Sequence, residues 1–73
     1  MRTIAYFTHL GDGQESGRLI RMYRNNRGTY TVDVEGYPAL SQTVESLEKA
    51  EQILRGWWQL SLKDWGATEI EWV

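Results

Sequence analysis

Residues 18–35, with the sequence RLIRMYRNNRGTYTVDVE, hold the pattern that decides the fold. In the second half of this stretch, from Thr29 to Glu35, apolar and polar residues alternate, which is the pattern of a half-buried strand. The first half, Arg18–Arg24, has the composition of a second strand, and the turn residues Asn25-Asn26-Arg27-Gly28 lie between the two. The sequence therefore predicts an antiparallel β-hairpin with one apolar face.

The turn also predicts the register of this hairpin. A three-residue loop, Asn26-Arg27-Gly28, puts Gly28 at the left-handed position that such loops require. The resulting pairs are Arg24 with Tyr30, Met22 with Val32, Ile20 with Val34 and Arg21 with Asp33. All apolar residues then share one face, and unlike charges oppose each other on the other face. A two-residue Asn-Asn turn would shift the alternation and break this agreement, so we expect the three-residue loop.

The segment before the hairpin predicts a first strand, Thr3–His9, which is rich in β-branched and aromatic residues. A polar, glycine-rich loop, Leu10–Gly17, connects it to the hairpin. After the hairpin, an irregular or extended stretch reaches Glu45.

A helix is expected after Ser46, which has the residue type of an N-cap. Apolar and small residues then recur at helical spacing: Leu47, Ala50, Leu54, Trp57 and Ser61. Gly56 inside the helix indicates a bend or a close approach to the sheet, and Gly66 predicts the C-terminal end. A last strand, Thr68–Val73, should turn Ile70 and Trp72 inward.

These elements predict one domain, residues 1–73, of the α+β class: a small antiparallel β-sheet with one amphipathic helix, in the order β-β-β-α-β. A chain of 73 residues has a small core, and the absence of cysteine excludes disulfides and thiolate zinc sites. The single histidine, His9, is too few for an ordinary metal cluster. We therefore expect no metal or cofactor, and homo-oligomerisation as the support for a core of this size, with the first or last strand at a sheet edge.

Charge and hydropathy limit the classes of partner that the protein is expected to bind. The net charge of −2 gives no general attraction to nucleic acid or to membrane surfaces. No apolar run is long enough to span a membrane, and the N-terminus lacks the apolar region of a signal peptide. A cytoplasmic location is the default expectation.

Three features of the sequence could carry catalysis. The carboxylates of Asp33, Glu35, Glu69 and Glu71 fall on one sheet face, where acid–base pairs or a simple solvated face are the two interpretations. His9 has no serine or cysteine nucleophile in a recognised setting. The loop around Gly11, Gly13 and Gly17 lacks the ending of a phosphate-binding loop and is not followed by a helix. We therefore expect a non-enzymatic protein that binds another macromolecule.

The sheet face opposite the helix is the expected partner-binding surface. It should carry Arg21, Tyr23, Asp33, Glu35, Glu69 and Glu71, with Phe7 as a further candidate. Arginine and tyrosine are common interface hot spots, and the carboxylates would suit a basic protein such as a nuclease or a nucleic-acid-binding complex. A plain solvated face is the alternative. Trp58, next to the core residue Trp57, is a competing anchor on the helix.

A second class of function rests on the hairpin from Arg18 to Arg27. Arginines interleaved with aromatics are typical of RNA- or DNA-binding surfaces, and Arg18, Arg24, Arg27 and Tyr23 are the candidates. Strand alternation, however, turns Arg21 away from Arg18 and Arg24. The acidic residues of the neighbouring strand would also repel phosphates, so we expect direct nucleic-acid binding to be the weaker alternative.

Residues 28–50 resemble the HicB-like antitoxin family, whose pattern is G-x-Y-x-V-x-F-P-D-L-P-G followed by T-L-E-E-A. Gly28, Tyr30, Val32 and Val34 are in step with it, Tyr37-Pro38 replaces Leu-Pro, and Ser46-Leu47-Glu48-Lys49-Ala50 falls at the spacing of the second motif. Glu35-Gly36, Ala39 and Val44 depart from it. The resemblance implies a partial ribonuclease-H-like fold that binds and silences a toxin ribonuclease. A small anti-defence inhibitor of the anti-CRISPR type, carried by a phage or mobile element, is a second version of the same class.

Overall fold

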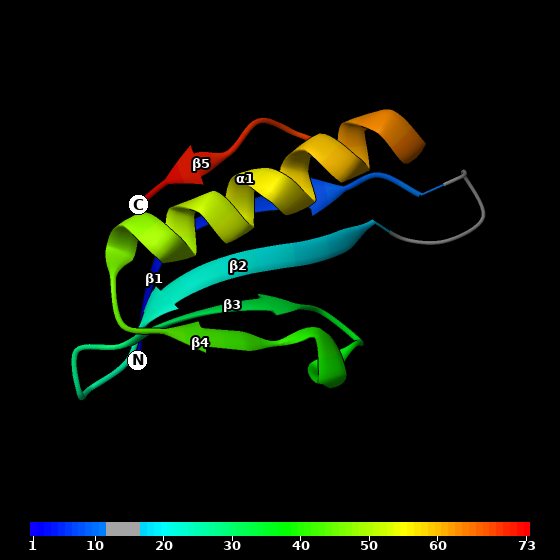
Figure 1. Ribbon diagram of the computed structural model, residues 1–73. Coiled ribbons are helices and arrows are strands. Elements are labelled where there is room, and N and C mark those ends of the chain that lie inside the picture. Colours follow the sequence, from blue (N-terminus) through cyan, green and yellow to red (C-terminus); the bar gives the residue numbers. More distant parts are fainter. Residues whose placement is uncertain (12–16) are drawn as a thin grey trace.

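A computed structural model describes residues 1–11 and 17–73 of the chain (Figure 1). Five strands form one sheet in the order β4-β3-β2-β1-β5, with every neighbouring pair antiparallel. The strands are β1 (Arg2–His9), β2 (Arg18–Arg24), β3 (Tyr30–Val34), β4 (Gln42–Val44) and β5 (Glu71–Trp72). A short 3₁₀ helix, η1 (Pro38–Leu40), precedes β4, and one α-helix, α1 (Leu47–Asp64), follows it. The predicted α+β class is confirmed; most of the predicted glycine-rich loop, residues 12–16, lies outside the described residues.

The β2–β3 hairpin has the predicted register. Arg24 lies opposite Tyr30, Met22 opposite Val32, Ile20 opposite Val34 and Arg21 opposite Asp33. The N–H of Asn25 donates to the carbonyl of Thr29 at 2.8 Å and closes the three-residue loop. Gly28 has φ of +80°, the left-handed conformation on which the register prediction depended.

In strand β1, the predicted position of Phe7 is wrong. Phe7, a candidate for the face opposite the helix, is fully buried and lies opposite Ile20 on the helix side. The cause is a bulge between Thr3 and Ala5, where the pairing with β2 shifts by one residue. Beyond the bulge, Ala5 and Phe7 both point into the core, and Ile4 still packs against it. Strict alternation cannot turn both Ile4 and Phe7 towards the core, whereas the bulge lets Phe7 be buried and Ile4 be partly buried against the core.

The helix begins and ends where the sequence indicated. The Ser46 hydroxyl accepts a hydrogen bond from the N–H of Lys49 at 3.2 Å, which caps the first turn. At the other end Gly66 has φ of +99°, and its N–H donates to the carbonyl of Ser61 at 2.7 Å. Gly56, however, is exposed, and a Cβ there would meet no atom within 4 Å. The expected close approach of Gly56 to the sheet is therefore wrong.

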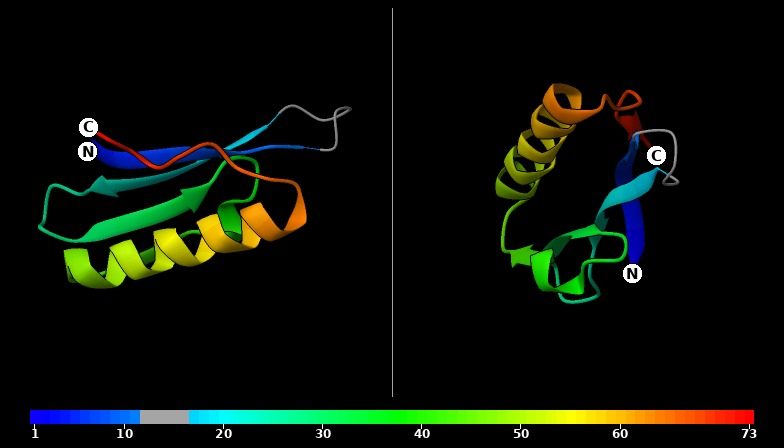
Figure 2. Two further views of the ribbon diagram at one scale, coloured as in Figure 1. Left: turned by 90° about the horizontal axis from the view of Figure 1, so that it is seen from above. Right: turned by 90° about the vertical axis from the view of Figure 1, so that its right-hand side faces the viewer.

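The helix covers one face of the sheet (Figure 2). Between them lies the core, in which Ala50 and Leu54 of α1 pack on strand residues. The buried strand residues are Ala5, Phe7, Ile20, Met22, Val32 and Val34. Trp57, expected in the core, is partly buried and packs against it. In the described part of the chain, no element covers the opposite face, called here the outer face.

Strand β5 is shorter than the predicted strand from Thr68 to Val73. Trp72 lies opposite Ala5 and therefore on the helix side, as expected, but it is 48% exposed. Its exposure follows from its place on an edge strand, which within the described residues has a strand neighbour on one side only. The last strand is thus at a sheet edge, whereas the first strand is interior.

Candidate functional site

The outer face is built from the strand residues that alternate with the core. Tyr6 stands between buried Ala5 and Phe7, and Arg21 stands between buried Ile20 and Met22. The same alternation places Leu19, Tyr23 and Asp33 on this face, and Glu71 joins them opposite Tyr6. The face therefore combines two tyrosines, an arginine and carboxylates over the four strands β3, β2, β1 and β5.

Arg21 lies at the centre of this surface because β2 is the middle strand of the sheet. It faces Asp33 on β3 and Tyr6 on β1. Its Nη2 is 3.2 Å from Asp33 Oδ2 and its Nε is 3.5 Å from Oδ1, a two-pronged contact. The guanidinium carbon is also 5.7 Å from the centre of the Tyr23 ring. These contacts hold the guanidinium between a carboxylate and an aromatic ring.

The Arg21–Asp33 pair contributes more to pre-organisation than to stability. The Arg21 side chain is 44% exposed and that of Asp33 is 21% exposed. Ion pairs at this exposure contribute only about 0–1 kcal/mol to folding. A side chain already held in one conformation, however, loses less entropy when a partner binds, which favours association. The arrangement therefore suits a contact surface.

A hydrogen-bond network stiffens the part of the outer face next to β4. The Asn25 amide donates to the hydroxyls of Thr29 and Thr31, both at 2.9 Å. The Thr31 and Thr43 hydroxyls lie 2.8 Å apart across β3 and β4. Thr31 is only 5% exposed although it alternates with core residues. This network satisfies its own polar groups within the chain.

The structure brings some of the predicted acidic residues to this surface and leaves others at its margin. Glu71 is exposed and lies opposite Tyr6. Glu35 lies just past β3, and its carboxylate accepts from the N–H of Leu19 at 3.3 Å. Glu69 is not in a strand, and it lines a surface depression together with Arg55 and Trp58 of the helix. Glu69 therefore does not join the group around Arg21.

Trp58, the competing anchor, takes part in holding the fold together. It is partly buried and packs against the core. Its indole N–H donates to the carbonyl of Thr68 at 2.9 Å, which ties the segment before β5 to α1. The one polar group of the side chain is thus already used within the chain.

Tyr6 is a site residue that the sequence reasoning missed. It is 37% exposed and lies directly opposite Arg21. The signal was the alternation through Ala5, Tyr6 and Phe7, which turns Tyr6 outward once Phe7 is placed in the core. The bulge at Thr3–Ala5 concealed that signal, because alternation counted from Ile4 gives the opposite answer.

The arginines of the hairpin separate as predicted. Arg18 and Arg24 lie on the same side of β2 as the core residues Ile20 and Met22, which is the helix side, and Arg21 is on the outer face. The Arg18 guanidinium lies 4.4 Å from the centre of the Tyr37 ring and donates to the Glu35 carbonyl at 3.4 Å. These side chains therefore do not form one continuous basic surface with Tyr23.

Within residues 1–11 and 17–73, no group of three His, Asp or Glu side chains could hold a metal ion. His9 lies in β1 opposite Arg18 and forms a bridge to Ala67. No helix in the described part of the chain is long and apolar enough to cross a membrane.

Comparison with known proteins adds no relative: no family model, curated protein or solved structure matches this chain.

Proposed function

We propose that this protein is a non-enzymatic inhibitor that binds a protein partner through the outer face of its sheet. The observation that carries the proposal is the uncovered Arg21 cluster, namely Arg21 with Tyr6, Tyr23 and Asp33 around it. Tyrosine and arginine supply much of the binding energy in protein interfaces. A central arginine, already oriented and ringed by accessible tyrosines, is a suitable hot spot.

The charge around this cluster supports a basic partner. Among the described residues, the outer face carries the carboxylates of Asp33, Glu35 and Glu71 and one cation, Arg21, which Asp33 already pairs. The excess of carboxylates attracts a positively charged surface and steers its approach. Nucleases and other nucleic-acid-acting proteins carry such surfaces, and we propose a protein of this kind as the target.

Two biological roles fit this chemistry. One is an antitoxin-like module, which the resemblance of residues 28–50 to HicB-like proteins favours. The other is a small anti-defence inhibitor of the anti-CRISPR type. In both roles the protein acts in the cytoplasm, needs no cofactor and masks the nucleic-acid site of its target.

Affinity capture from the native host tests the proposal. The bait is the full chain, and the matched control is the double variant Arg21→Ala/Tyr23→Ala, whose substitutions lie outside the core. We expect a basic protein that the wild type retains after nuclease treatment and that the double variant loses. Equal capture by both baits, or capture that nuclease treatment abolishes, would overturn the proposal.

A small RNA- or DNA-binding module remains the second candidate. It is favoured by Arg24 and Arg27, which have no ion-pair partner among the described residues. Its weakness is the separation of the hairpin's arginines over two faces. Nuclease-sensitive capture in the same experiment would support it.

A further inference from the structure

Two arginines of like charge lie side by side on the helix side of the sheet. Arg2 of β1 is the direct cross-strand partner of Arg24 of β2, and Arg24 is in turn the partner of Tyr30 of β3. Arg24 alternates in step with buried Met22, so this row of three residues points to the side that α1 covers. Leu47, the first residue of α1, lines the same surface depression as the row. The row and the start of the helix therefore form one surface.

This depression has an apolar part and a cationic part. It has a volume of about 260 Å³ and is lined by Arg2, Thr3, Ile4, Arg24, Tyr30, Leu47 and Val73. Ile4 and Tyr30 are partly buried and pack against the core. Arg2 and Arg24, in contrast, are exposed. Small-molecule sites are typically about 300–1,000 Å³, so the depression has room for a small ligand of one ring and one charged group.

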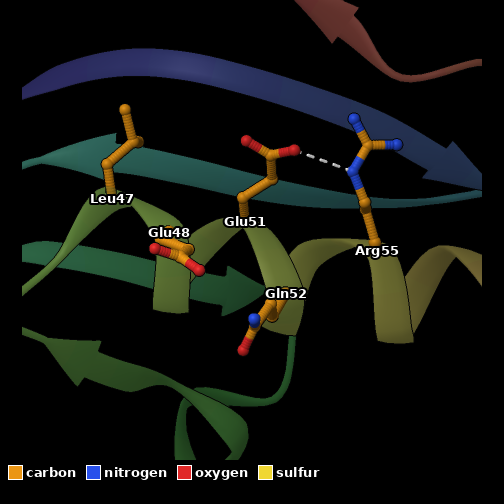
Figure 3. Close-up of a pocket in the computed structure, with 5 residues that line it drawn as sticks. All are labelled: Leu47, Glu48, Glu51, Gln52 and Arg55. Atoms are coloured by element: carbon orange, nitrogen blue, oxygen red, sulfur yellow. Dashed lines mark hydrogen bonds and ion pairs between the residues drawn. The ribbon is translucent and has the colours of Figure 1, made fainter.

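Within the described chain, no negative charge is paired with these two arginines. No ion pair joins Arg2 or Arg24 to Val73 or to any other described residue. On α1, the carboxylate of Glu51 is paired with Arg55 at 2.9 Å, as Figure 3 shows. Like charges in directly opposite strand positions repel each other and lower stability. Such conflicts between a local sequence choice and the fold are expected mainly at functional or strained sites.

The geometry of the pair suits a doubly charged anion. Directly opposite residues of antiparallel strands have Cα atoms about 4.5–5.5 Å apart, so both guanidinium groups can reach one ligand. A phosphomonoester carries a charge of about −1.5 to −2 at neutral pH and has three strong acceptor oxygens, which balances both arginines. Arginine also binds phosphate through two parallel N–H donors. A carboxylate or a phosphodiester carries one negative charge and would leave one arginine unbalanced.

From this arrangement we propose that the depression binds a small phosphomonoester that carries an aromatic ring. The phosphate bridges the guanidinium groups of Arg2 and Arg24 and removes their repulsion. The ring lies on the apolar part of the depression, against Ile4, Tyr30 and Leu47. The site is on the helix side of the sheet, away from the Arg21 cluster, so it stands or fails independently of the proposed function.

Titration of the ¹⁵N-labelled full chain with phenyl phosphate, followed by amide chemical shifts, tests the site. We expect saturable shifts at the residues that line the depression. The affinity should be at least tenfold higher than for methyl phenyl phosphate, a diester with the same ring, and than for benzoate. Inorganic phosphate should shift the same signals with lower affinity, because it lacks the ring. Equal affinity for monoester and diester, or no saturable shift at these residues up to about 10 mM, would overturn the proposal.

Matched variants separate a binding role of the arginines from a structural one. Arg2→Gln and Arg24→Gln should each weaken the binding of phenyl phosphate at least tenfold, with the circular dichroism spectrum retained. Arg27→Gln, in the turn and outside the depression, should leave the affinity unchanged. Arg2→Gln should also raise the melting temperature of the ligand-free protein, because it removes the repulsion. A lower melting temperature together with unchanged affinity would show a purely structural role and contradict the proposal. Tighter binding of an unphosphorylated oligonucleotide than of phenyl phosphate would also contradict it, because the arginines would then serve a nucleic-acid backbone.

Discussion

Gly28 and Gly56 differ in whether the backbone conformation requires a glycine. Gly28 has φ of +80° in the hairpin turn, a conformation that side chains with a Cβ disfavour. Gly56 is helical and exposed, with open space where a Cβ would be. The backbone thus requires glycine at the first position only.

This contrast predicts opposite effects of the same substitution. Gly28→Ala should lower the free energy of unfolding by about 1–2 kcal/mol, because the Cβ of alanine makes the left-handed conformation unfavourable. Gly56→Ala should raise it by up to about 1 kcal/mol, because alanine favours the helix. Urea unfolding of both variants measures the two changes. A destabilising Gly56→Ala would show that this position has a contact that the structure lacks.

Neighbouring aromatic residues in β1 provide a second test at the residue scale. Phe7→Ala should cost about 3–5 kcal/mol, because it empties a fully buried position in the core. Tyr6→Ala, one residue away and 37% exposed, should cost much less. Thermal unfolding followed by circular dichroism compares the two variants. If Tyr6→Ala were the more damaging substitution, the bulge and the outer face would both be wrongly assigned.

Which side of the sheet each β1 residue faces could not be predicted from the sequence. In β2 and β3, the alternation of Ile20, Met22, Val32 and Val34 agrees with the turn, so the register could be predicted residue by residue. In β1, Ile4 and Phe7 are three positions apart, and no regular strand buries both. The bulge that resolves this depends on contacts with β2, which a local pattern does not contain.

At the scale of elements, the long segments were predictable and the short ones were not. Helix α1 has a cap, a periodic apolar stripe and a terminal glycine, all of which are local signals. Strands β4 and β5, with three and two residues, are defined by the strands that they pair with. The same holds for the candidate site. The hairpin register predicted that Arg21 and Asp33 face each other, whereas the position of Tyr6 on the outer face was known only from the structure.

The two edge strands lead us to expect self-association. Among the described residues, β4 and β5 each have a strand neighbour on one side only, and β4 is exposed over most of its length. Open edges pair readily with a second copy, and a domain of this size gains stability from doing so. Sedimentation velocity at rising concentration should show a dimer or larger assembly. A monomer at every concentration up to several hundred micromolar would contradict this expectation.

At the scale of the whole molecule, the distribution of charge favours a protein-binding function over a nucleic-acid-binding one. The net charge is −2, and the hairpin's arginines point to different faces. We therefore expect no submicromolar binding to random RNA or duplex DNA at physiological salt, measured by fluorescence anisotropy. A binder that used its arginines would lose affinity with a log–log slope of about −0.9 per phosphate contacted on duplex DNA. Tight binding with such a slope would reverse the ranking of the two functions.

The Arg21 cluster is the central claim, and calorimetric titration with the captured partner tests it most directly. The variants are Arg21→Ala/Tyr23→Ala, Asp33→Lys/Glu35→Lys and Trp58→Ala, each first checked for retained folding by circular dichroism. Both outer-face variants should lose about 2 kcal/mol or more of binding free energy, because they remove the hot spot or reverse its charge. Trp58→Ala should bind as the wild type does. Normal binding by the two outer-face variants together with loss of binding by a folded Trp58→Ala would place the interface on the helix and contradict the account.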